Sequence, residues 1–127
     1  MKTIVILGST GSIGTSTLDI VDRFPEEFCV AGLTAGSNDE KIEEQIRRFK
    51  PRVVALSDAS AAARLRDRCA ELPVEILSGQ EGLIQVATAP EAELVISAIV
   101  GGAGLVPTLA AIRSGKQIAL ANKEPMV

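Results

Sequence analysis

Residues 8–14 read GSTGSIG and directly follow the apolar run TIVIL at residues 3–7. A β-branched strand that leads through a glycine-rich turn into a helix is typical of the phosphate-binding corner of dinucleotide-binding folds. Gly8 would let the chain turn sharply away from the strand. Gly11 would let the backbone approach a pyrophosphate, and Gly14 would let the helix pack closely on the strand. The N-terminus of that helix would add unpaired N–H groups and a partial positive charge, which favour a phosphate.

The glycine spacing is G-x-x-G-x-x-G, which is a looser pattern than G-x-G-x-x-G. A glycine-rich turn that binds no ligand is the alternative interpretation, but the position between the first strand and the first helix favours dinucleotide binding. Thr15 and Ser16 follow Gly14. The absence of a lysine there excludes a P-loop.

Composition limits the possible functions. With 127 residues, of which 46% are hydrophobic, the chain is long enough for one domain with its own core. The net charge is −3, and the densest basic cluster, at residues 47–52, is interpreted as a solvated helix end, so we expect no nucleic-acid partner. No apolar stretch is long enough to span a bilayer or to act as a signal peptide, which predicts a cytoplasmic protein without a membrane partner. Cys29 and Cys69 lack Cys-x-x-Cys spacing and are predicted to be reduced, buried side chains.

Two missing residue types exclude whole classes of site. The chain has no histidine, so neither a Ser-His-Asp triad nor a histidine-ligated zinc site can lie within it. It also has no tyrosine, which excludes the Tyr-Lys pair of the short-chain dehydrogenases, although those enzymes often share the glycine spacing found here.

Apolar runs alternate with amphipathic segments along the whole chain. Several runs, such as VVAL at residues 53–56, are continuously apolar and therefore typical of parallel strands buried on both faces. The pattern predicts an α/β fold: a Rossmann-like, doubly wound, mostly parallel sheet with helices on both faces. The predicted strands are 3–7, 29–34, 53–56, 74–77, 94–98 and 117–120, and the predicted helices are 12–23, 38–49, 60–69, 80–87 and 104–114.

Ligands of such sheets bind beyond the carboxyl ends of the strands. Glycine-rich or polar segments stand at four of these ends, at residues 8–13, 35–38, 100–102 and 121–124. The second segment contains Ser37 and Asn38 where NAD-binding folds usually carry an acidic residue, and both side chains can donate hydrogen bonds to a 2′-phosphate. This favours NADP over NAD. The alternative role for Asn38 is to cap the following helix, and the two roles are compatible.

Four sequence blocks resemble the 1-deoxy-D-xylulose 5-phosphate reductoisomerase family. They are GSTGSIG with STLDIV at 16–21, AGSN at 35–38, SAIVGGAGLVPTLAAIRSGK at 97–116 and LANKE at 120–124. The resemblance covers the whole chain and implies the N-terminal NADPH-binding domain, residues 1–127, of an oxidoreductase for isoprenoid precursor synthesis. That family rearranges and reduces 1-deoxy-D-xylulose 5-phosphate to 2-C-methyl-D-erythritol 4-phosphate with NADPH and a divalent metal, Mg or Mn.

The resemblance also implies roles for individual residues. The NADPH pyrophosphate region would be held by Thr10, Gly11, Ser12 and Ile13. The adenosine ribose phosphate would be lined by Gly36, Ser37 and Asn38. Asn122 and Glu124 would contact the cofactor near its nicotinamide, and Lys123 would reach the phosphorylated sugar.

The chain departs from the family in length and at two positions. Ser37 stands where the family often has lysine or arginine, and Pro125 where it usually has serine or threonine. Family members are about three times longer, since they include catalytic and dimerisation domains. We therefore expect no catalytic residue and no metal ligand in this chain, no activity from it alone, and a homodimer for the full-length enzyme. The alternatives are a stand-alone nucleotide-binding module without catalysis and the cofactor domain of another NADP-dependent dehydrogenase.

Overall fold

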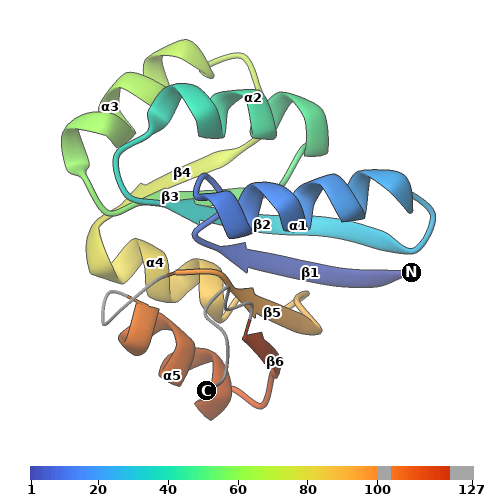
Figure 1. Ribbon diagram of the computed structural model, residues 1–127. Helices are drawn as coiled ribbons and strands as arrows, with labels where there is room; N and C mark the ends of the chain where they lie inside the picture. Colours follow the sequence, from blue (N-terminus) through green and yellow to red (C-terminus); the bar gives the residue numbers. More distant parts are fainter. Residues whose placement is uncertain (100–103, 121–127) are drawn as a thin grey trace.

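The computed structural model describes residues 1–99 and 104–120. Within these residues strands and helices alternate strictly, as Figure 1 shows. No end of an element differs from its predicted position by more than one residue. The strands are β1 (Lys2–Leu7), β2 (Phe28–Ala35), β3 (Val53–Leu56), β4 (Glu75–Ser78), β5 (Leu94–Ser97) and β6 (Gln117–Leu120). The helices are α1 (Ser12–Arg23), α2 (Asp39–Phe49), α3 (Ala59–Arg68), α4 (Gly79–Ala87) and α5 (Leu105–Arg113).

The six strands form one sheet in the order β4-β3-β2-β1-β5-β6, and every pairing among them is parallel. The predicted Rossmann-like, doubly wound sheet is confirmed. The sequence predicts a mostly parallel sheet, and the described strands are all parallel. The strand order reverses between β1 and β5, because the chain winds outward from β1 in one direction and returns to β5 on its other side. In open α/β sheets ligands bind in the crevice at the carboxyl ends of the strands flanking such a reversal.

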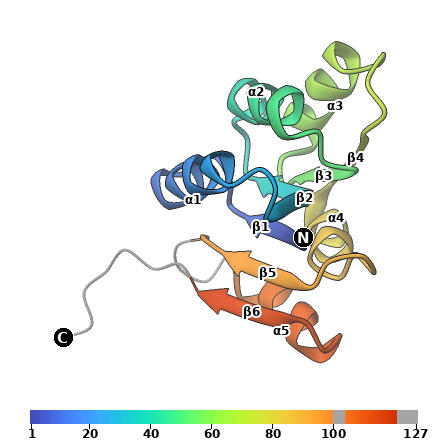
Figure 2. The same cartoon turned by 90° about the vertical axis from the view of Figure 1, so that its right-hand side faces the viewer.

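Helices cover both faces of the sheet. Helices α1, α2 and α3 lie on one face and α4 and α5 on the other, which is visible in Figures 1 and 2. Each face has its own apolar core. The first joins residues such as Ile4 and Ile6 of β1 to Leu18 of α1 and Ile42 of α2, and the second joins other residues of the sheet to α4 and α5. The central strand β1 contributes to both, and its last four residues are completely buried. The glycine turn therefore follows directly from a completely buried strand end.

Not every apolar residue of α1 is buried. Gly14, Leu18 and Val21 are buried, at the i, i+4, i+7 spacing of one helix face. Ile20, in contrast, is 53% exposed and lies outside this face.

Of the two cysteines, only Cys69 matches its prediction. Cys69 is buried, and burial raises the pKa of its thiol. Cys29 is exposed, so its predicted burial is wrong: it is the second residue of β2, and the burial of this strand begins only at the following residue. Neither forms a disulfide. Among the helices in the described ranges, none is both long enough and apolar enough to cross a bilayer.

Candidate functional site

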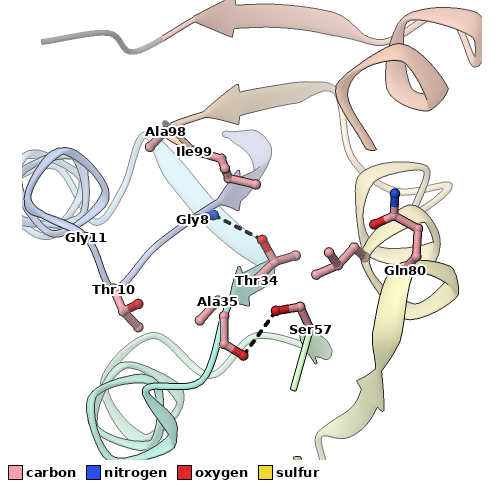
Figure 3. Close-up of a pocket in the computed structure, with 11 residues that line it drawn as sticks. Gly8, Thr10, Gly11, Thr34, Ala35, Ser57, Gln80, Ala98 and Ile99 are labelled. Carbon is pink, nitrogen blue, oxygen red and sulfur yellow. Dashed lines mark hydrogen bonds between the residues drawn. The ribbon is translucent and has the colours of Figure 1, made fainter. Parts of the chain in front are cut away.

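The turn after β1 is fixed by backbone hydrogen bonds to the end of β2. The N–H groups of Gly8 and Ser9 both donate to the carbonyl oxygen of Thr34, at 3.1 and 2.8 Å, and Gly8 also donates to the Thr34 hydroxyl at 3.0 Å (Figure 3). Gly8 has φ +80°, a backbone conformation that residues with a side chain rarely adopt. A Cβ there would lie 2.8 Å from the Ile99 side chain. The sharp departure from β1 thus requires glycine at this position.

Gly14 is required for a different reason, namely close packing. A Cβ at Gly14 would lie 2.1 Å from the carbonyl oxygen of Gly8 and 2.6 Å from the Cα of Ser9. Helix α1 therefore touches the backbone of the turn directly. This confirms the predicted role of Gly14 in packing the helix on the strand.

Gly11 is the one glycine of the motif that the described protein atoms do not require. The atom nearest to a Cβ built there would be the Gly8 oxygen at 4.0 Å. Its backbone, φ −75° and ψ 176°, is extended and open to any residue, and it caps α1 without a side-chain hydrogen bond. Its lack of a side chain leaves the first N–H groups of α1 accessible from outside the protein, as an approaching anion needs.

The hydroxyl of Ser9 is structural, although Ser9 lies within the glycine-rich motif. Ser9 is completely buried. Its Oγ donates to Gln45 Oε1 at 2.7 Å, and Gln45 Nε2 donates back to the Ser9 carbonyl at 2.8 Å. This reciprocal pair joins the turn to α2. It was missed because a buried glutamine on a helix carries no local sequence signal.

The segment after β2 presents Gly36, Ser37 and Asn38 at the surface, and all three are exposed. Asn38 Oδ1 accepts from the Lys41 N–H at 3.1 Å, so the capping role considered for it is confirmed. Its amide nitrogen is not used by that cap. The end of β3 lies beside this segment, because Gly36 O accepts from the Asp58 N–H at 3.1 Å and from the Ser57 hydroxyl at 3.4 Å (Figure 3).

The next residue, Asp39, is acidic but is turned into the protein. Its carboxylate accepts hydrogen bonds from Arg68 at 2.6 Å and from Arg64 at 3.2 Å, and its side chain is 10% exposed. Arg68 first, then Arg64, lowers the pKa of this carboxyl below its ordinary value. A carboxylate that already accepts hydrogen bonds from two guanidinium groups is a poor acceptor for a ribose hydroxyl.

A cavity of about 400 Å³ lies at the carboxyl edge of the sheet, over the point where the strand order reverses. Figure 3 shows how the turn, the ends of the strands and the start of α4 surround it. None of its described lining residues is charged, so polar recognition there depends on N–H groups, hydroxyls and one amide. The lining consists of Gly8, Thr10, Gly11, Thr34, Ala35, Gly36, Ser57, Gln80, Leu83, Ala98 and Ile99.

The cavity unites only part of the predicted site. Thr10, Gly11 and Gly36 line it together. Ser12 and Ile13 lie in the first turn of α1, exposed and half-buried respectively, and Ser37 and Asn38 lie on the open surface beside the cavity. Asn122, Lys123 and Glu124 fall outside the described residues.

The structure adds residues that the sequence analysis did not select. Ser57 and Ile99 follow β3 and β5, so the rule that ligands bind at strand ends could have found them. Gln80 and Leu83 belong to α4, which follows β4 and covers the face of the sheet opposite α1. No local pattern marks them. In the described ranges no three Cys, Asp or Glu side chains gather as they would around a metal ion.

Comparison with known proteins identifies the family. The family model for 1-deoxy-D-xylulose 5-phosphate reductoisomerase matches residues 4–127. The chain belongs to the 1-deoxy-D-xylulose 5-phosphate reductoisomerase family. A reductoisomerase from Anaeromyxobacter sp. (strain K) is 55% identical over 129 residues, and one from Geobacter metallireducens is 54% identical over 127 residues. Both alignments cover all of this chain but 32% and 33% of those relatives, so the chain spans about a third of their length.

Solved reductoisomerase structures have the same fold. A complex of DOX-P reductoisomerase with NADPH, fosmidomycin and magnesium superposes with a TM-score of 0.91 at 42% identity, covering 98% of this chain and 31% of that one. The Zymomonas mobilis enzyme in complex with NADPH gives 0.89 at 39% identity, covering 96% of this chain and 32% of that one.

Proposed function

We propose that residues 1–127 form the NADPH-binding domain of a reductoisomerase. The full-length enzyme would be an oxidoreductase and isomerase that rearranges and reduces 1-deoxy-D-xylulose 5-phosphate to 2-C-methyl-D-erythritol 4-phosphate. Family membership and the solved NADPH complexes of relatives support this proposal. The observation that carries it in this chain is Gly11: its missing side chain is explained by a ligand and not by the described protein atoms.

The residues of the site suit the successive parts of a dinucleotide. The N–H groups at the start of α1, with the hydroxyls of Thr10 and Ser12, would donate to the pyrophosphate, and Ile13 would provide an apolar contact. Gly36, Ser37 and Asn38 would lie along the adenosine ribose. The cavity wall formed by Leu83, Ala98 and Ile99 would exclude water from one side of the cofactor.

We place the reacting end of the cofactor toward the end of β6. Asn122 and Glu124 would contact NADPH near the nicotinamide, which supplies hydride when bound, and Lys123 would bind the phosphorylated sugar substrate. A lysine there can donate hydrogen bonds to sugar oxygens and stabilise negative charge that develops during rearrangement. The ligands of a divalent metal, Mg or Mn, would come from parts of the full-length enzyme that this chain does not span. The full-length protein is proposed to be a cytoplasmic homodimer.

A preference for NADPH over NADH follows from the charges around the end of β2. Asp39 is the acid nearest in sequence to Ser37, and its carboxylate is bound by two arginines. It therefore cannot take the ribose-binding role of the acid in NAD-specific folds. Titration calorimetry with both cofactors checks this preference, which would be contradicted by equal or tighter binding of NADH.

Gly11→Val tests the proposed function itself. Its branched side chain would fill the space through which a pyrophosphate must reach the helix N-terminus, so we expect no measurable NADPH binding by calorimetry. The fold should persist, because no described atom lies closer than 4.0 Å to the added Cβ. Ala70→Val, in an exposed turn at the opposite edge of the sheet, adds the same two methyl groups and should bind NADPH like the unmodified chain. Normal NADPH binding by Gly11→Val would show that the glycine turn is structural only.

A further inference from the structure

Two arginines of α3 balance the negative charge that an acidic residue places beside the end of β2. Asp39 begins α2 two residues after Ser37, close to where an NAD-binding fold carries its ribose-binding acid. Both of its carboxylate oxygens are occupied: Oδ1 accepts from Arg64 and Oδ2 from Arg68. A negative charge at this position is thus balanced, and guanidinium groups are brought to it.

The two arginines differ in how many hydrogen bonds their guanidinium groups donate to carboxylates. Arg68 donates to Asp39 at 2.6 Å and also to Glu43 at 2.6 Å, and its side chain is 37% exposed. Arg64 makes one hydrogen bond to a side chain in the described structure, at 3.2 Å, and its side chain is 54% exposed. A guanidinium carries five N–H donors. Arg64 therefore keeps donors directed to solvent while one contact holds its position.

The position of Arg64 is set by the joined ends of β2 and β3. Gly36 O accepts from the Asp58 N–H, and Asp58 caps α3 by accepting from the Ser60 N–H at 3.1 Å. Helix α3 therefore begins next to the segment that contains Ser37, and Arg64 lies on the second turn of that helix. Figures 1 and 2 both show α2 and α3 side by side on the same face of the sheet.

We propose that Arg64 binds the 2′-phosphate of NADPH and that Asp39 is the residue that positions it. This rests on the proposed function and adds a specificity-determining residue to it. An arginine near the end of the second strand is the usual partner of a 2′-phosphate, and its planar fork suits bidentate binding to phosphate oxygens. Ser37 and Asn38 would supply neutral donors to the same phosphate from the β2 side.

Lys41 provides a matched control. It lies in the first turn of α2, like Asp39, but lines the groove between α1 and α2, where Asp19 and Asp22 also lie. Its removal changes the net charge by the same amount as the removal of Arg64. It does so on the other side of the helix, away from α3.

Adenosine 2′,5′-bisphosphate and 5′-AMP isolate the contribution of the 2′-phosphate, and calorimetry measures their affinities for the whole 127-residue chain. Arg64→Gln should weaken the bisphosphate about tenfold, the usual effect of losing a charge-assisted hydrogen bond, and change 5′-AMP less than about twofold. Lys41→Gln should leave the ratio of the two affinities unchanged. Adding Ser37→Lys to Arg64→Gln should restore the bisphosphate affinity, because it returns a cation to the same phosphate from the β2 side.

The outcomes separate this proposal from the proposed function. Unchanged bisphosphate affinity in Arg64→Gln, or an equal loss for both ligands, would overturn the role of Arg64 while NADPH binding by the unmodified chain remained. Failure of the unmodified chain to bind NADPH would overturn the proposed function, and the assignment of Arg64 with it. A circular dichroism melt of each variant excludes loss of folding as the cause of weaker binding.

Discussion

The two glycines Gly11 and Gly14 should lose very different amounts of stability when each is replaced by alanine. Gly14→Ala introduces a Cβ 2.1 Å from the Gly8 oxygen, which is roughly 1.2 Å shorter than an ordinary close carbon–oxygen contact. Gly11→Ala introduces one whose nearest neighbour is 4.0 Å away. Both glycines lie in the same seven-residue motif, so the pair isolates packing from changes in the unfolded chain.

The cost of Gly14→Ala follows from what must move to relieve the contact. The turn at Gly8 and Ser9 is held by hydrogen bonds to Thr34 and Gln45, and separating α1 from it would weaken two or three of them, at about 1 kcal/mol each. Overpacking of the helix start raises the total to about 3–4 kcal/mol. The higher helix propensity of alanine recovers about 1 kcal/mol. The net loss of unfolding free energy should therefore be about 2–3 kcal/mol.

Gly11→Ala should cost about 0.5 kcal/mol or less, because the loss of a better helix cap is largely offset by the lower conformational entropy that alanine gives the unfolded chain. Urea unfolding followed by far-ultraviolet circular dichroism suits this chain, since it contains neither tryptophan nor tyrosine for fluorescence. For a domain of this size the melting temperature should fall by roughly 10 °C in Gly14→Ala and by a few degrees at most in Gly11→Ala. Equal stability of the two variants would refute the argument from packing.

Three further predictions concern the turn, the carboxylate of Asp39 and the substrate side of the site. Gln45→Leu should destabilise the fold by about 1–3 kcal/mol, because the buried Ser9 carbonyl loses its hydrogen bond from Gln45 and the Ser9 hydroxyl keeps only the longer contact to Thr34 O at 3.4 Å; urea unfolding measures this, and a stability equal to that of the unmodified chain would show that the pair is dispensable. The pKa of Asp39 is lowered on folding by Arg68 and Arg64, so its contribution to stability is present above the ordinary aspartate pKa and is lost as the pH falls through the lower folded value; in acid melts Asp39→Asn should therefore show a weaker dependence of stability on pH, and an unchanged dependence would contradict this. In the full-length enzyme, Lys123→Ala should lower turnover roughly a hundredfold while changing NADPH affinity little; steady-state kinetics with a separate NADPH titration decides this, and loss of affinity with normal turnover at saturating cofactor would place Lys123 on the cofactor side.

The sequence by itself determined the order, the type and nearly the exact ends of the strands and helices. Short apolar runs such as residues 53–56 are typical of strands buried on both faces of a sheet, and the glycine spacing of residues 8–14 has few structural explanations. Local patterns also predicted the packing role of Gly14 and the cap at Asn38. These features depend on residues close together in the chain, and so a single sequence is sufficient to predict them.

Only the tertiary structure decided which of these residues act together. It showed that Gly11 faces open space whereas Gly14 touches backbone, a distinction that depends on how α1 lies against the turn. It also turned Asp39 inward to two arginines 25 and 29 residues further along the chain, and Ser9 inward to Gln45, 36 residues away. The physical reason is that burial and hydrogen-bond partners are set by the packing of α2 and α3 on one face of the sheet. No periodicity in the sequence encodes which polar side chain will meet which.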